Sequence, residues 1–166
     1  YFPSHEIDGE GYHTKRLTDH EAHFLEQVLS SDPEERRNPP PVIRRAIMDF
    51  IITCGVRWWR EWLKKGLEEK PSKDEISRSY GHHAMIVHLS LLKENQEMVR
   101  KTVEMEWPGA VEAFDSFDPK MSPDDHPFRE RWRLQTERTR ALRGSSFLPY
   151  DEISYFMRSC IDIATE

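Results

Sequence analysis

Apolar residues recur at helical spacing along most of the chain. The first such segment spans residues 17–30, where Thr18 stands as a helix N-cap and Glu21 follows three residues later. Phe24, Leu25 and Val28 then form one apolar stripe at intervals of three and four residues. This pattern predicts a short amphipathic helix.

The longest apolar run spans residues 41–65, between a triple proline and Gly66. Proline suits the first turn of a helix and glycine its C-terminus. The apolar side chains occupy one sector before Gly55 and another after it. The first sector comprises Ile43, Ala46, Ile47, Phe50 and Cys54, and the second comprises Trp58, Trp59, Trp62 and Leu63. We therefore predict a central helix that changes neighbours near Gly55, because an interior glycine costs about 1 kcal/mol relative to alanine and needs a packing reason.

Four further helical patterns follow. Ser72 and Glu75 repeat the start signal for a helix over residues 72–106, with a break allowed at Gly81 or at the polar segment 93–97. Pro108 is expected to end that helix and to begin a short one at 108–117. The last two amphipathic patterns cover residues 128–143 and 150–164.

The sum of these elements is an all-α fold, a single-domain bundle of about five to six helices around the central helix at about 41–65. A chain of 166 residues with 37% hydrophobic content is long enough for one sizeable core. Residues 1–16 contain Pro3, Gly9 and Gly11 without a sustained period, and we interpret them as an irregular N-terminal arm. Residues 17–166 are then a helical domain, which we interpret as excised from a longer protein because the chain begins without methionine.

Charge and cysteine content narrow the possible partners. Asp49 and Arg57 interrupt the apolar run before it reaches the length of a membrane span. A formal net charge of -6 makes nucleic acid an unfavourable partner for the surface as a whole. Cys54 and Cys160 lie in apolar patterns without zinc spacing, so we expect buried free thiols and an intracellular protein, cytoplasmic or nuclear.

The sequence offers little for catalysis. It contains neither a GxSxG nucleophile elbow nor a glycine-rich phosphate loop, and thiols in apolar stripes are poor nucleophiles. We therefore favour a non-enzymatic protein that needs no cofactor. The eight histidines keep a metal- or haem-binding alternative open, such as an oxygen or redox enzyme. Its candidate ligands are His20, His23, His83 and His88, from the helices predicted at 17–30 and 72–106, although no HExxH motif is present.

Arginine and tryptophan mark two candidate binding surfaces. One side of the helix at 128–143 carries Arg129, Arg133 and Arg140, beside Trp132. Each guanidinium group can bind a carboxylate through two parallel hydrogen bonds. The alternative is a solvated helix whose arginines pair internally with glutamates. In "WWREW" three tryptophans cover half of the helix circumference, so Trp59 or Trp62 is a candidate for lining a groove.

These features favour a protein–protein interaction domain, an adaptor or scaffold module that binds another protein or an acidic peptide segment. The partner would contact an aromatic groove, the arginine-rich helix, or both. The metal- or haem-binding protein is the first alternative. The second is a self-assembling scaffold or virus-type structural protein, a homo-oligomer in which the arm at residues 1–16 exchanges between copies.

Overall fold

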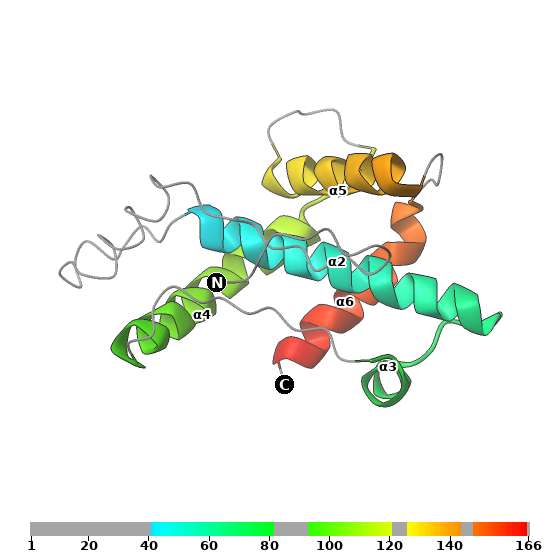
Figure 1. Ribbon diagram of the computed structural model, residues 1–166, viewed down its shortest axis with the longest axis horizontal. Coiled ribbons are helices and arrows are strands. Elements are labelled where there is room, and N and C mark those ends of the chain that lie inside the picture. The colour runs from blue at the N-terminus through cyan, green and yellow to red at the C-terminus, as the bar shows by residue number, and fades with distance from the viewer. Residues whose placement is uncertain (1–40, 82–92, 121–125, 144–147, 166) are drawn as a thin grey trace. The chain divides into compact units, whose positions relative to one another are not determined.

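The computed structural model describes residues 41–81, 93–120, 126–143 and 148–165, and every regular element within these ranges is a helix (Figure 1). The all-α prediction is therefore confirmed. The predicted arm at 1–16 and the predicted helix at 17–30 lie outside the described residues. The helices are α2 (Pro41–Lys65), α3 (Lys73–Ser79), α4 (Lys93–Asp115), α5 (Pro127–Arg143) and α6 (Tyr150–Thr165).

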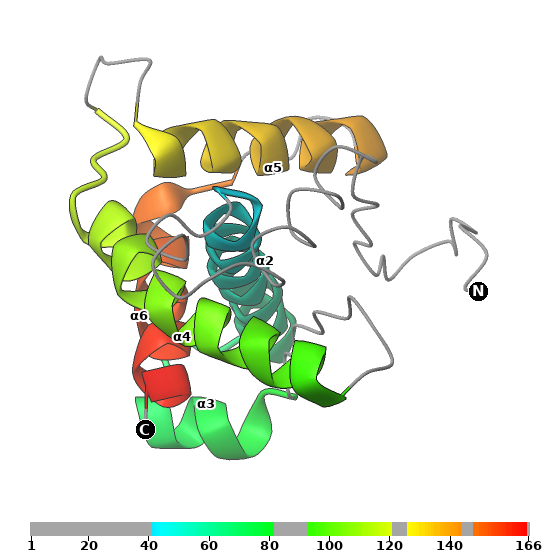
Figure 2. The same ribbon diagram turned by 90° about the vertical axis from the view of Figure 1, so that its left-hand side faces the viewer.

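Helix α2 is the central element of residues 41–166. It packs most extensively against α6, then against α4 and α5, and Figure 2 shows these helices around α2 viewed along its axis. Because neighbours lie on several sides, Met48, Ile51 and Ile52 are buried along with the predicted Ile43 and Ile47. The buried surface of α2 before Gly55 is thus wider than the apolar sector that the sequence predicts there.

The predicted change of neighbours at Gly55 has a clear structural basis. A methyl group added to Gly55 would clash with Cγ of Met157 and lie 3.1 Å from the backbone nitrogen of Met157 on α6. The backbones of α2 and α6 therefore approach closely at this point. Beyond it, Trp58 is buried as expected, but Leu63 is 50% exposed. The inward placement of Leu63 is wrong because it lies in the last turn of α2, where Lys64 and Lys65 are also exposed.

The helix predicted over 72–106 is interrupted beside Gly81, one of the two places where the sequence allowed a break. Helix α3 ends at Ser79 and Tyr80 has extended backbone angles, while residues 82–92 lie outside the described ranges. Its predicted start is confirmed, since Oγ of Ser72 accepts a hydrogen bond from the backbone of Glu75 at 3.3 Å.

Pro108 does not end a helix, because α4 continues through it to Asp115. The proline ring lies on an exposed side of α4, while Glu106 and Ala110 are buried on another side and hold the following turn in place. Helix α4 is not straight along its length (Figure 2), and a proline inside a helix, which removes one backbone hydrogen bond, is a common cause of bending.

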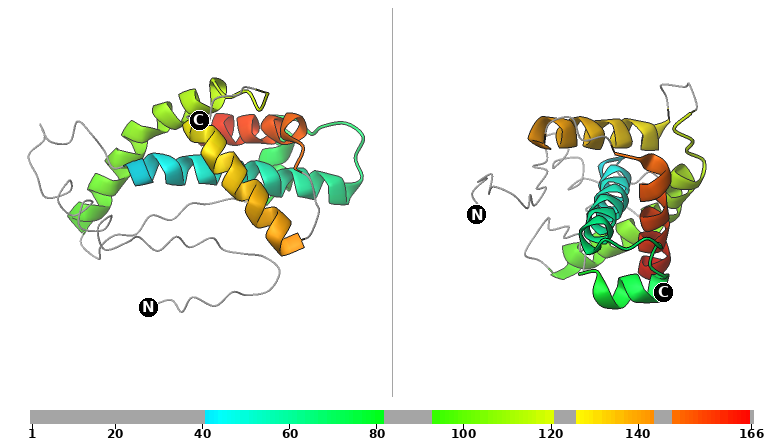
Figure 3. Two further views of the ribbon diagram at one scale, coloured as in Figure 1. Left: turned by 90° about the horizontal axis from the view of Figure 1, so that it is seen from above. Right: turned by 90° about the vertical axis from the view of Figure 1, so that its right-hand side faces the viewer.

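Two partly buried ion pairs join α2 to its neighbours. Nε of Arg44 donates to Oε2 of Glu106 at 2.6 Å, although the Glu106 residue is only 3% exposed. Arg131 of α5, which crosses α2 in Figure 3, donates to both carboxylate oxygens of Asp49, with a distance of 2.7 Å from Nε to Oδ1. Paired hydrogen bonds of this kind fix both distance and orientation between helices.

Helix α6 is close to its predicted pattern. Its apolar residues Ile153, Phe156, Met157, Cys160 and Ile161 are all buried. Ala164 was expected on the same buried stripe but is exposed, because it lies in the last turn before the helix ends. The buried stripe of α6 therefore stops one turn before Thr165.

Candidate functional site

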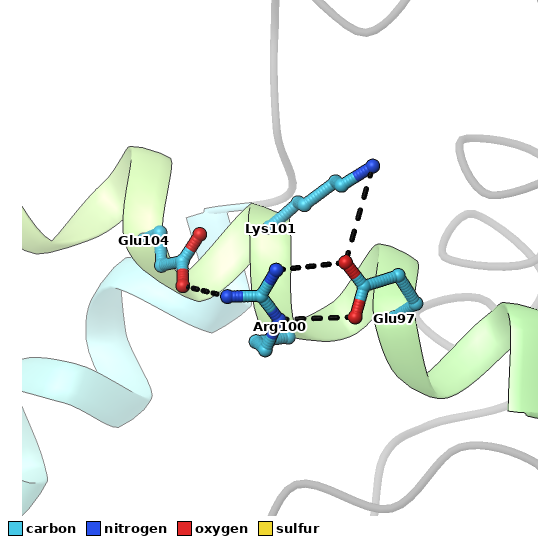
Figure 4. Close-up of polar contacts among 4 residues, drawn as sticks. All are labelled: Glu97, Arg100, Lys101 and Glu104. Atoms are coloured by element: carbon cyan, nitrogen blue, oxygen red, sulfur yellow. Dashed lines mark hydrogen bonds and ion pairs between the residues drawn. The ribbon is translucent and has the colours of Figure 1, made fainter.

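The exposed face of α4 begins with a network of charges. Arg100 donates to both carboxylate oxygens of Glu97, at 3.0 and 2.7 Å, and also to Glu104, while Lys101 lies 4.0 Å from Glu97 (Figure 4). The Arg100 guanidinium lowers the pKa of the Glu97 carboxyl, and Glu97 in turn raises the pKa of Arg100. These charges satisfy one another along a single helix, which is typical of a solvated surface.

Farther along α4 the exposed surface becomes apolar and forms one wall of a groove. Trp107 and Val111 are four residues apart, so they share a helix face. Together with Ile161 of α6 they line an open groove of about 800 Å³. The full lining comprises Lys73, Trp107, Pro108, Val111, Glu112, Asp115, Ile161, Asp162 and Thr165.

The rim of this groove, which we call the α4–α6 groove, carries more acidic than basic groups. Glu112, Asp115 and Asp162 are all exposed, and Lys73 at the start of α3 is the cation in the lining. Arg158 donates to Asp115 from α6, and its guanidinium lies 4.9 Å from the ring centre of Phe114. The groove therefore combines an aromatic, apolar surface with a predominantly negative rim.

The tryptophans that the sequence nominates for partner binding have internal partners instead. Nε1 of Trp59 donates to Oε2 of Glu152 at 2.7 Å. Trp62 donates to the backbone carbonyl of Glu69 at 3.0 Å and lies 6.0 Å from the ring of Phe156. Trp132 packs edge-on against Tyr150 at 5.2 Å. Each ring is partly buried and helps to join helices, and none of the three lines the α4–α6 groove.

The arginine-rich helix is also more internally bonded than expected. Nη1 of Arg133 donates to Oε1 of Glu137 at 2.7 Å, and Arg129 is partly buried. Arg131, on the same helix, is committed to Asp49 in the core. The side chain of Arg140 lies outside the described residues. This arrangement agrees better with the internally paired helix than with an open arginine surface.

The proposed metal ligands cannot be placed. His20, His23, His83 and His88 all lie outside the described residues. Among the residues that the structure does describe, histidine, cysteine, aspartate and glutamate side chains do not form a group of three suited to a metal ion. His126, which is described, accepts a hydrogen bond from the backbone of Phe128 at 3.3 Å and lies 3.1 Å from Oγ of Ser116, so it caps the start of α5.

Sequence reasoning missed Trp107 and Val111 because Pro108 was taken as a helix boundary between them. Had the helix been continued, their spacing would have placed both on one face, with Glu112 and Asp115 beside them. Ile161 was assigned to the core, and it is indeed buried, yet it also borders the groove. The local proline signal therefore concealed the aromatic surface.

Comparisons with protein-family models, curated proteins and solved structures gave no match to this chain. In the described part of the chain, no helix combines the length and apolar character that crossing a membrane requires. Inference about function therefore depends on the chemistry of the α4–α6 groove.

Proposed function

We propose that this chain is a non-enzymatic protein–protein interaction domain whose α4–α6 groove binds a basic, amphipathic segment of a partner protein. The observation that carries the proposal is the pairing of Trp107 and Val111 with Ile161 beneath a rim of three carboxylates. An amphipathic helix laid in such a groove would place its apolar side chains on the floor and its lysines or arginines at the rim.

The apolar floor supports an anchor role for Trp107. Tryptophan is among the residues most enriched at positions that dominate binding energy, and those positions lie near the centre of an interface. Trp107 is partly exposed, with Val111 one turn farther along α4. A partner leucine or phenylalanine would remove this surface from water, which is the main favourable term in helix-in-groove binding.

The rim supports a basic partner and not an acidic one. Asp115 is already paired with Arg158, but Glu112 and Asp162 still outnumber Lys73 in the lining, and the whole chain has a net charge of -6. Complementary charge speeds association and disfavours partners of the wrong sign. The acidic peptide segment considered for the arginine-rich helix is a weaker proposal, because Arg133 already bonds to Glu137.

The two alternative functions depend on other parts of the chain. A metal or haem site would use His20, His23, His83 and His88, and exchange between copies would use the arm at 1–16. Neither set of residues is described, so no contact supports these functions over the groove.

A pair of synthetic peptides tests the proposal. We would titrate the full chain with a helical leucine–lysine peptide and with a matched peptide in which glutamate replaces lysine, and follow Trp fluorescence and calorimetric heat. We expect saturable binding of the lysine peptide alone, weakened at higher salt because rim charges are screened. Equal binding of both peptides, or of neither, would overturn the proposal.

Variants locate the binding surface. Trp107→Ala should weaken lysine-peptide binding by roughly 30-fold, the effect of losing about 2 kcal/mol at an anchor residue. Glu112→Lys/Asp162→Lys should weaken it at least as much and should gain affinity for the glutamate peptide. Glu130→Lys, an equally exposed change on α5, is the matched control and should leave affinity unchanged. If the control lost as much affinity for the lysine peptide as the groove variants do, the assignment of the binding site to the α4–α6 groove would be wrong.

A further inference from the structure

The chain's two cysteines lie on two helices that pack against each other, α2 and α6. Cys54 and Cys160 are 1% and 3% exposed, and they belong to the same buried cluster. The neighbouring Gly55 lies so close to α6 that a methyl group there would be 3.1 Å from the Met157 backbone nitrogen. A disulfide requires backbones that approach closely, with Cα atoms usually 4.4–6.8 Å apart. The close approach of the two backbones beside Cys54, and the shared cluster of the two cysteines, make a disulfide between α2 and α6 sterically reasonable.

A small cavity adjoins the thiol pair. It has a volume of about 160 Å³ and is lined by both cysteines together with Phe50, Trp58 and Tyr80. Its lining also includes Ser77 of α3 and Ala164 of α6, which are both exposed and so mark its mouth. Because a water molecule occupies about 30 Å³ in the liquid, the cavity admits molecules of the size of hydrogen peroxide and excludes bulky ones such as oxidised glutathione.

We propose that Cys54 and Cys160 form a modification site for small peroxides, which oxidise the pair to a disulfide joining α2 and α6. One sulfur, as thiolate, attacks a peroxide oxygen; the O–O bond breaks, a sulfenic acid forms, and the departing hydroxide takes up a proton to become water. The second thiol then attacks the sulfenic sulfur, the S–S bond forms, and a second water leaves. The two thiols lose two electrons and two protons, and the peroxide is reduced to two molecules of water.

The two steps differ in rate. Burial raises the pKa of the Cys54 thiol, and the neighbouring Cys160 acts in the same direction. Cys54 therefore rests as a thiol, and the first reaction with peroxide is slow. The second step is fast because the resolving sulfur lies in the same buried cluster, so the sulfenic acid is captured before further oxidation. The product is a disulfide and not an over-oxidised cysteine.

Intact-mass measurement after oxidation tests this proposal. The folded full chain is exposed to hydrogen peroxide, quenched, unfolded and alkylated with iodoacetamide. We expect the oxidised chain to be about 2 Da lighter than the reduced chain and to take up no iodoacetamide. Digestion should then release a peptide pair cross-linked between Cys54 and Cys160. Oxidised glutathione should leave the folded chain reduced but should react once the chain is unfolded. Addition of two or three oxygens to one cysteine, a disulfide between two chains, or reaction of both oxidants at equal rates would each overturn the proposal.

A variant at the cavity mouth tests the route independently of the thiols. Ser77→Leu would fill the mouth from an exposed position and should slow oxidation of the folded chain by about fivefold or more, without changing oxidation of the unfolded chain. Ser79→Leu, two residues away on the same helix but not in the cavity lining, is the matched control. Equal oxidation rates in these two variants would exclude the cavity as the peroxide route, and Cys160→Ser should abolish the loss of 2 Da.

Discussion

Charged side chains bond the N-terminal half of α2 to its neighbours, whereas rings and thiols hold the half that surrounds and follows Gly55. In the first half, Arg44 pairs with Glu106 and Asp49 with Arg131. In the second, Trp58 and Cys54 belong to a buried cluster with residues of α3 and α6. Ion pairs of fixed geometry set how helices align. Packing defects are present in the second half, where a cavity measures about 160 Å³ and the buried Tyr80 hydroxyl has no hydrogen-bond partner among the described residues.

The largest expected effect comes from removing the central ring of the aromatic half. Phe156 is fully buried and lies 6.0 Å from the ring of Trp62 and 6.5 Å from that of Tyr80. Phe156→Ala should lower the free energy of unfolding by about 4 kcal/mol, through lost burial and the void left behind. Urea denaturation measures this value. A loss below about 1 kcal/mol would show that this half does not depend on ring packing.

A somewhat smaller effect is expected in the charged half. Asp49→Asn leaves the Arg131 guanidinium buried without its counter-charge and should cost about 3 kcal/mol, measured by the same denaturation. The double variant Asp49→Leu/Arg131→Met removes both charges and should recover most of that loss. If the double variant were as unstable as Asp49→Asn, the loss would reflect packing around these residues and not an uncompensated charge.

Two tyrosines in the aromatic half provide a matched pair. Replacing each by phenylalanine should change the free energy of unfolding in opposite directions. Tyr80→Phe removes a buried hydroxyl that finds no hydrogen-bond partner in the described ranges, so it should raise the free energy of unfolding by about 1 kcal/mol. Tyr155→Phe removes a hydroxyl that donates to the carbonyl of Pro71 at 2.7 Å, and it should lower stability by about 1 kcal/mol. Thermal or urea unfolding of both variants decides the sign. Destabilisation by Tyr80→Phe would mean that this hydroxyl has a partner in solution.

The smallest effect on stability is expected at Arg133, two residues after the buried Arg131. Arg133 pairs with Glu137 on the exposed surface of α5, and both side chains are more than half exposed. Arg133→Ala should change the free energy of unfolding by no more than about 0.5 kcal/mol, because solvent and salt screen such pairs. A loss close to that of Asp49→Asn would remove the distinction between exposed and buried arginines on this helix.

Local signals in the sequence were sufficient for much of the fold. The N-cap at Ser72, the change of neighbours at Gly55 and the apolar stripe of α6 each depend on residues within one or two turns of one another. Pro108 was misjudged because tertiary packing of Glu106 and Ala110 overrides a proline whose ring meets solvent.

The interactions between helices could not be inferred in the same way. The bond between Arg131 and Asp49 spans 82 residues of sequence, and that between Arg44 and Glu106 spans 62. In a linear pattern Arg131 resembles Arg133, although one is buried and the other exposed. The α4–α6 groove likewise depends on which face of α4 meets α6, and the proximity of Cys54 to Cys160 depends on where α2 crosses α6.

Gly55 has a consequence for how this fold can vary over evolution. Even the methyl group of alanine would meet Met157 and lie 3.3 Å from Cγ2 of Ile153, so a larger residue at this position must move α6 away from α2. Homologues that retain this helix pairing should therefore retain glycine at this site, while the exposed position of Lys64 should vary more. A glycine three residues before a buried tryptophan, paired with a Met–x–x–Cys segment near the C-terminus, is a sequence signature by which distant relatives could be recognised.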